Sequence, residues 1–289
     1  MTNKNPVEKN HFIPCYWSAY WNFEYLNAKR KNQLTNSPRH TKISYLNLKG
    51  NKILNGKTEK VFIDKCRGLA ILETDNDFEK LKNNFIFHNN SDEISNQSDL
   101  LLLDFENHFT EYENISRSAL ERTILSKKIK DIEDKTFLAQ FFMFQEIRNP
   151  FILNKRYDFL LKNGKNKVDL LLEVRDFFTN KKKLENILIP LVFSKWVVYS
   201  LEDYKFPLPD KPILYNKNNI LVPLAPDILI EIQLDKKTEN IASYKNKISF
   251  FKYLKFSNRL TKNVNMEVVG DDYLLNKLKK RKKRFANTV

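Results

Sequence analysis

The stretch of sequence that decides the fold is Ile-Leu-Val-Pro-Leu-Ala-Pro-Asp-Ile-Leu-Ile-Glu-Ile, residues 220–232. Its two β-branched runs, 220–222 and 228–232, favour strands, and the prolines between them favour a turn. Comparable runs lie at 197–199, 213–215 and 268–269. The last third of the chain is therefore predicted to be mainly β.

Between residues 75 and 150, apolar residues follow helical spacing. A capping box at Ser118 would begin one helix, and Pro150 would end the last one. Positions three and four apart lie on the same side of a helix. The last helix is thus predicted to have one face made of Leu138, Phe141, Gln145 and Arg148.

The order of the elements indicates the fold class. Strands are expected at 42–48 and 61–63, and one helix near 242–254 interrupts the β-rich end. Because helices and strands do not alternate strictly, a parallel βαβ fold is disfavoured. We predict an α+β fold with a helical middle and a mainly antiparallel or mixed sheet formed by the N-terminal and C-terminal thirds. Residues 1–270 would form a single domain, and 271–289 a basic C-terminal helix or tail.

The segment 11–26 is dense in aromatic residues. Phe12, Tyr16, Tyr20 and Phe23 fall at helical spacing. The favoured interpretation is a helix packed into the core, and the alternative is a platform on which nucleic-acid bases stack.

Composition and charge limit the class of protein. The 289 residues include 50 Lys and Arg against 35 Asp and Glu, which gives a formal net charge of +15. Such a charge either attracts a polyanion such as nucleic acid or reflects AT-rich coding, which favours Lys. With only 5 glycines, none of them closely clustered, a glycine-rich phosphate loop is excluded. The basic residues at 277–284 form either a solvated end or an arm that binds nucleic acid.

Two isolated cysteines predict a reducing compartment. The polar start and the lack of a long apolar stretch predict a cytoplasmic protein with no membrane partner.

Four short motifs follow one another in the order of a known family. They are Asn10-His11-Phe12-Ile13-Pro14, Gln145-Glu146-Ile147-Arg148-Asn149-Pro150, Phe206-Pro207-Leu208-Pro209-Asp210-Lys211-Pro212 and Pro223-Leu224-Ala225-Pro226, with Asn240 after them. With these motifs the chain resembles the domain-of-unknown-function family 4238. Asn149 departs from the Thr of the family pattern, and Leu208-Pro209 from its Thr-Ser. The resemblance implies a role in bacterial defence against phage, because some members resemble single-gene defence systems whose effectors act on nucleic acid.

The residues in these motifs have the chemistry to cleave a phosphodiester bond. His11 titrates near neutral pH and can act as general acid or base. Arg148 can stabilise charge on a phosphate, and Asp210 can orient His11 or hold a metal ion. These three are the candidate catalytic residues. The candidate substrate-binding residues are Gln145, Asn240 and Lys211.

A structural interpretation competes with the catalytic one. In it, His11 caps a backbone turn, and Arg148 and Asp210 form a buried ion pair. We assign no residue as a metal ligand, and a divalent metal ion stays open as a cofactor. A further pattern, Asp227 with Glu231, echoes a nuclease metal site. In a strand these two residues would lie roughly 13 Å apart, too far to share one metal ion, so we discount it.

The favoured function is a bacterial antiviral effector that acts on RNA or DNA, with nuclease activity through His11. The alternative is a non-enzymatic sensor or binding module of a defence system. A housekeeping protein with a small-molecule site is the third hypothesis. The expected partners are nucleic acid and a phage-derived trigger.

Overall fold

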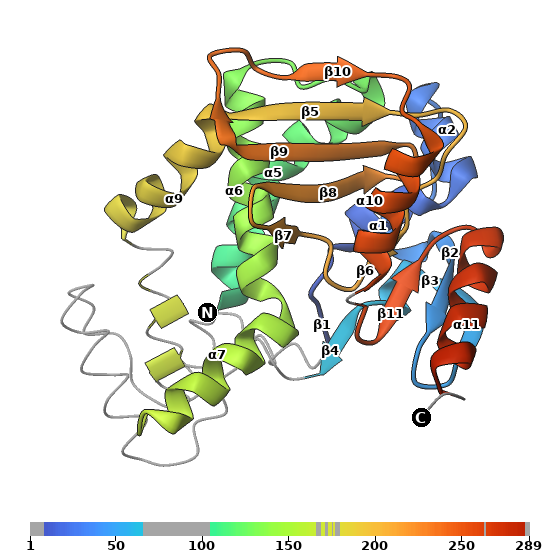
Figure 1. Cartoon of the computed structure of the whole chain (residues 1–289), viewed down its shortest axis with the longest axis horizontal. Coiled ribbons are helices and arrows are strands. Elements are labelled where there is room, and N and C mark those ends of the chain that lie inside the picture. The colour runs from blue at the N-terminus through green and yellow to red at the C-terminus, as the bar shows by residue number, and fades with distance from the viewer. Residues whose placement is uncertain are drawn as a thin grey trace.

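The decisive stretch at 220–232 forms the middle of a five-stranded sheet in the computed structural model of the chain (Figure 1). The structure describes residues 9–65, 105–165, 169–170, 173–174, 176, 180–262 and 264–286. In sheet order the strands are β10 (Ser243–Lys245), β5 (Ser194–Ser200), β9 (Ile228–Lys237), β8 (Asn219–Ala225) and β7 (Leu214–Asn216). The pair β10 and β5 is parallel and the other pairs are antiparallel, so the sheet is mixed.

Both faces of β8 and of the first half of β9 are buried. Val222 pairs with Ile230, and both belong to the main hydrophobic core. Their neighbours Leu221 and Leu229 point to the opposite face and belong to a second core cluster. A strand that is covered on both sides has a continuous apolar run instead of alternating residues. The register shifts between Pro223 and Ala225, and such irregular places tolerate a proline that cannot donate to the ladder.

A second sheet contains strands from both the N-terminal and the C-terminal third of the chain. In order its strands are β3 (Lys52–Lys57), β2 (Lys42–Asn47), β11 (Glu267–Val269) and β6 (Leu208–Pro209), all paired antiparallel. A separate antiparallel pair consists of β1 (Lys9–His11) and β4 (Ile63–Lys65). The N-terminal and C-terminal thirds therefore share a sheet as predicted, and the C-terminal third forms the five-stranded sheet alone.

Helices occupy the middle of the chain, and the predicted α+β class is confirmed. They are α5 (Phe105–Ser126), α6 (Ile132–Arg148), α7 (Pro150–Lys162) and α9 (Lys181–Phe193), followed near the end by α10 (Phe250–Lys262) and α11 (Asp272–Ala286). Figure 1 shows α5 and α6 on one side of the five-stranded sheet and α10 on the other. Leu120 and Phe142 pack into the core on the first side, and Phe256 packs against Tyr199 on the second.

The aromatic N-terminal segment folds as short helices, not as the single helix expected. They are α1 (Cys15–Ser18), a 3-10 turn (Ala19–Trp21) and α2 (Phe23–Arg30). Pro14 precedes α1, and the Asn22 side chain caps the first turn of α2. Phe12 and Tyr20 are buried in the main core, whereas Phe23 is 41% exposed. Core packing, and not a stacking platform, is therefore the main role of the segment.

Three local expectations differ from the structure. Ser118 lies inside α5 and does not begin a helix, because α5 continues through the buried Ala119 and Leu120. The strand expected at 61–63 begins only at Ile63. The helix expected near 242–254 begins at Phe250, because residues 243–245 pair with β5 instead. The part of the helical pattern before residue 105 lies outside the described residues.

The C-terminal segment contains a helix that packs on the second sheet. Leu275 of α11 is fully buried with Leu46 of β2 and Val268 of β11. In the part of the chain that the structure describes, no helix combines the length and apolarity needed to cross a membrane.

Candidate functional site

His11, at the end of β1, is held by the backbone of a distant loop. Its Nδ1 lies 3.2 Å from the Val61 carbonyl oxygen. Because a carbonyl oxygen only accepts hydrogen bonds, Nδ1 carries the proton and the ring lone pair is on Nε2. Burial lowers the pKa of His11 below 6.5, the Val61 contact opposes this, and the charges of Arg39 and Arg148 lower the pKa further. The imidazole is thus neutral at neutral pH and suited to accept a proton.

Arg148 and Gln145 lie on one face of α6, as their spacing predicts, and both contact Glu113 of α5. Arg148 Nη1 donates a hydrogen bond to Glu113 Oε1. Gln145 Nε2 lies 3.5 Å from the same oxygen. Of these three side chains, Gln145 is the most deeply buried, since the residue is only 2% exposed. The pair of helices therefore fixes a guanidinium within electrostatic reach of His11.

Tyr16 of α1 completes the site. Burial raises the pKa of Tyr16 well above its ordinary value, the Glu113 charge raises it further, and the Arg148 charge lowers it. The Arg117 guanidinium lies 5.1 Å from the centre of the Tyr16 ring. Within the described part of the chain, the Tyr16 hydroxyl is buried without a hydrogen-bond partner, and so is Gln145 Oε1. Buried polar atoms without a partner are rare in folded proteins, so these two mark an unusual place in the core.

We name this site the histidine–arginine cluster, defined by His11, Tyr16, Glu113, Gln145 and Arg148. Sequence analysis predicted three of its members and missed Tyr16 and Glu113. A signal for Glu113 was available, because it lies seven residues before the buried Leu120 and so on the same helical stripe. Tyr16 had been assigned to the core with the other aromatic residues.

Asp210 performs a different task from the one expected. Its carboxylate accepts hydrogen bonds from the backbone amides of Asn265 at 2.9 Å, Met266 and Glu267 at 3.3 Å. Burial raises the pKa of Asp210 to about 6, although these amide contacts lower it. The side chain thus anchors β6 to the segment that leads into β11. This geometry does not support the orienting role expected for Asp210, because the group that orients His11 is the Val61 carbonyl.

The backbone of Asp210 nevertheless contacts the residue that follows α6. The Asn149 side chain donates to the Asp210 carbonyl oxygen at 2.8 Å. The Lys211 ammonium lies 3.5 Å from the Glu146 carboxylate near the end of α6. Lys211 is therefore close to the same end of this helix. The buried Arg148–Asp210 ion pair of the structural interpretation is replaced by the ion pair between Arg148 and Glu113.

Asn240 is separate from the other candidate residues. It is exposed between β9 and β10, and its backbone amide donates to Thr238 at 3.1 Å. Figure 1 shows β10 at the edge of the large sheet farthest from β1. Of the six candidate residues, Gln145 and Arg148 share the Glu113 carboxylate, and the Arg148 charge lowers the pKa of His11. Asp210 and Lys211 lie near the end of α6, and Asn240 is separate.

The residues of the discounted metal pattern contact different partners. Asp227 accepts two hydrogen bonds from Arg30, at 2.8 and 3.0 Å. Glu231 accepts from Tyr199 and Asn219, each at 2.7 Å. Over the described ranges, no three His, Cys, Asp or Glu side chains gather closely enough to hold a metal ion.

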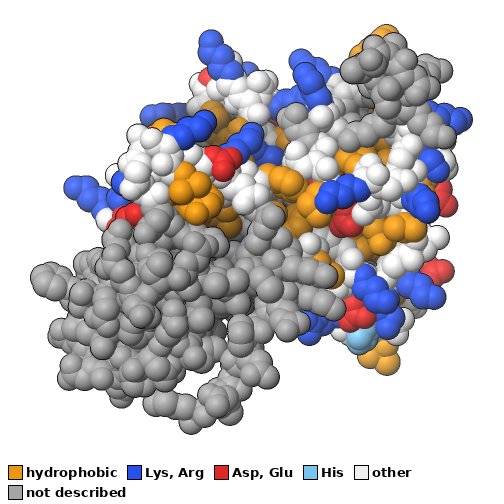
Figure 2. Space-filling model, turned by 90° about the horizontal axis from the view of Figure 1, so that it is seen from below, with side chains coloured by type: hydrophobic (Ala, Val, Ile, Leu, Met, Phe, Trp, Pro, Cys, Tyr) orange, Lys and Arg blue, Asp and Glu red, His pale blue; other side chains and the backbone are white. Residues whose placement is uncertain are grey.

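On the described part of the face seen in Figure 2, basic side chains are scattered and do not form one patch. Figure 2 shows Lys and Arg side chains among acidic and hydrophobic ones on the described part of that face. The densest run of charge in the sequence is in α11, which has seven Lys and Arg at 277 and 279–284. Of this run, Lys277, Lys279 and Lys280 lie on the part of α11 whose side chains the structure describes.

Comparisons of the chain with family models, with curated proteins and with solved structures found no match.

Proposed function

We propose that the chain is an antiviral effector of bacteria that acts in the cytoplasm and cleaves RNA at the histidine–arginine cluster. The observation that carries the proposal is the tautomer of His11, with Nδ1–H on the Val61 carbonyl and the lone pair on Nε2, in a ring whose pKa the charge of Arg148 lowers. The role in phage defence comes from the resemblance of the four motifs to family 4238.

RNA is favoured over DNA because it contains its own nucleophile. In the proposed reaction, His11 Nε2 accepts the proton of a 2′-hydroxyl, and the oxygen attacks the adjacent phosphorus. The bond to the 5′-oxygen breaks, and the imidazolium returns the proton to that leaving group. The products are a 2′,3′-cyclic phosphate and a free 5′-hydroxyl, so protons and bonds balance.

Arg148 has the charge that this reaction needs at the phosphate. A guanidinium has five donors in a fixed fork, and it stabilises the negative charge that grows on phosphate oxygens. The contact with Glu113 keeps the guanidinium oriented. A substrate phosphate would share or displace this carboxylate, and Tyr16 is the second donor available in the cluster.

The test is incubation of the purified protein with total cellular RNA and with plasmid DNA, with and without Mg²⁺ or Mn²⁺. We expect RNA to be fragmented, and fragmentation to be lost in His11→Ala without a change in melting temperature. The matched control is His40→Ala, since His40 is a mostly exposed histidine whose side chain faces Glu59 at 3.5 Å. Equal fragmentation by the wild type and His11→Ala would overturn the proposal.

A second function, a non-enzymatic sensor or binding module, is favoured by the basic run in α11. It predicts nucleic-acid binding that falls steeply with salt, while His11→Ala changes little. Binding without fragmentation in the same experiment would select this second function.

A further inference from the structure

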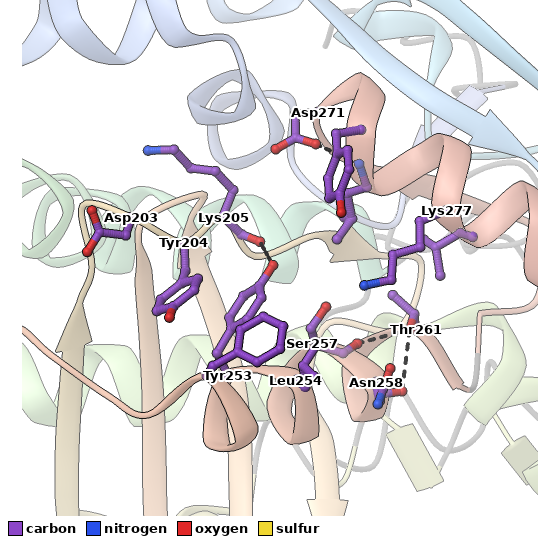
Figure 3. Close-up of a pocket in the computed structure, with 14 residues that line it drawn as sticks. Asp203, Tyr204, Lys205, Tyr253, Leu254, Ser257, Asn258, Thr261, Asp271 and Lys277 are labelled. Atoms are coloured by element: carbon purple, nitrogen blue, oxygen red, sulfur yellow. Dashed lines mark hydrogen bonds between the residues drawn. The ribbon is translucent and has the colours of Figure 1, made fainter.

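A cavity of about 250 Å³ lies between α10, α11 and the segment 203–205 (Figure 3). Four aromatic side chains line it: Tyr204, Phe250, Tyr253 and Tyr273. The rings of Tyr204 and Tyr253 stack, with centroids 4.3 Å apart and an interplanar angle of 16°. The Tyr253 hydroxyl donates to the Lys205 carbonyl oxygen at 3.0 Å, which fixes the ring. The cavity therefore has a rigid aromatic wall on one side.

The opposite side of the cavity is polar and contains one inward cation. In Figure 3 the Lys277 ammonium points from α11 toward Thr261 and Ser257 of α10. Lys205 points elsewhere, because its ammonium lies 4.6 Å from the centre of the Phe23 ring. The Asp271 carboxylate accepts a hydrogen bond from the Leu274 amide at 2.7 Å and so caps α11. A ligand in the cavity would thus meet aromatic rings at one end and a positive charge at the other.

We infer that this cavity binds one nucleotide unit of single-stranded nucleic acid, with the base against the aromatic wall and the phosphate on Lys277. Stacking on aromatic rings combined with a cationic track for the backbone is how proteins bind single strands. Drug-sized ligands occupy cavities of roughly 300–1,000 Å³, so a cavity of about 250 Å³ suits one nucleotide and not two. The inference deepens the proposed function and rests on it, since nucleic acid is the proposed target.

The sequence beyond the cavity supports a strand over a free nucleotide. After Lys277, α11 continues with six more Lys and Arg at 279–284. Successive phosphates leaving the cavity along α11 would first meet Lys279 and Lys280. A free nucleotide has no neighbouring phosphates that could contact these side chains.

The experiment measures binding separately from cleavage. A fluorescent 2′-O-methyl RNA oligonucleotide lacks the 2′-hydroxyl, so the proposed reaction cannot cleave it. The cavity variants are Tyr273→Ala and Lys277→Gln, and their matched controls are Phe251→Ala and Lys255→Gln. Tyr273 and Phe251 are 78% and 82% exposed, so neither truncation removes core packing. Lys255 is exposed on α10 and does not line the cavity.

We expect each cavity variant to weaken binding about tenfold, the loss of roughly one stacked base or one phosphate contact. The controls should change it by less than about threefold. Adenosine monophosphate should compete only weakly with the oligonucleotide. Tight competition by the free nucleotide would overturn the assignment to a strand. Equal effects of Lys277→Gln and Lys255→Gln would overturn the cavity as the binding site.

The outcome is distinguishable from failure of the proposed function. Cavity-dependent binding without cleavage of unmodified RNA would leave the cavity in place and remove the reaction at His11. If the cavity variants bind the oligonucleotide normally while the protein cleaves RNA, the reaction at His11 remains and the cavity is removed as the binding site.

Discussion

The Glu113 carboxylate of α5 accepts a hydrogen bond from the Arg148 guanidinium of α6. The two side chains are 20% and 10% exposed, so the ion pair is largely removed from water. Gln145 reaches the same carboxylate oxygen from one turn earlier in α6. One carboxylate therefore positions both polar residues of the α6 face in the histidine–arginine cluster.

This ion pair should show energetic coupling in a double-mutant cycle. Glu113→Gln or Arg148→Met alone leaves a mostly buried charge without its counter-charge, which should lower the free energy of unfolding by about 1–3 kcal/mol. The double variant should lose less free energy of unfolding than the two single variants lose together. Urea denaturation measures all four proteins. The pair of Arg156 and Glu173 is more exposed, at 47% and 32%, and should couple by less than about 1 kcal/mol. Similar coupling in both cycles would contradict the buried role of Glu113.

The rate of RNA cleavage should depend on the titration of His11. Because the pKa of His11 is lowered below 6.5, the neutral base is retained at neutral pH and is lost only in more acidic solution. The acid limb of the pH–rate profile should therefore have its midpoint below pH 6.5. Titration of the His11 ring protons by NMR should give the same midpoint. A midpoint above 6.5 would show that another group is the base.

The same pKa shift of His11 affects stability. Between the lowered pKa and 6.5, the unfolded chain binds more protons than the folded chain, so stability falls as pH falls through this window. His11→Gln should remove that part of the pH dependence.

Asp210 should make the protein less stable as pH rises from about 4 to about 6. The pKa of Asp210 is raised from 3.8 to about 6, so the folded state binds more protons than the unfolded state in this window. The contribution of Asp210 to the free energy of unfolding falls by up to about 3 kcal/mol across this pH window. Asp210→Asn keeps an acceptor for the amides near Met266 but cannot titrate. Urea midpoints from pH 4 to 7 should decline less in this variant, and an unchanged decline would refute the assignment.

Lys135 should have the opposite pH dependence in alkaline solution. It is 1% exposed, and its ammonium donates to the Ser194 carbonyl oxygen at 3.1 Å. Burial lowers the pKa of Lys135 from 10.5 to about 8, so the unfolded state binds more protons between these values. Stability should then rise by about 2 kcal/mol from pH 8 to pH 10 through this group. Lys135→Met should flatten the rise measured by urea denaturation, whereas Lys130→Met, at an exposed lysine, should leave it unchanged.

The sequence predicted the elements whose pattern is local. The β-branched runs gave β5, β7, β8 and β9, and the helical spacing of Gln145 and Arg148 placed both on one face of α6. These predictions succeeded because a strand or helix repeats its burial every two or 3.6 residues along the chain. The Ser118 capping pattern failed because packing of the whole α5 face outweighed a local start signal.

Only the tertiary structure decided which distant groups meet. Val61 orients His11 from 50 residues away, Glu113 pairs with Arg148 from 35 residues away, and Asp210 binds amides 55 to 57 residues further on. No periodicity encodes such contacts, because they depend on how the helices and the two sheets pack. The sequence by itself therefore determined the α+β class and the residues with the required chemistry. Packing made Asp210 an anchor, brought Glu113 to Arg148, and opened the cavity between α10 and α11.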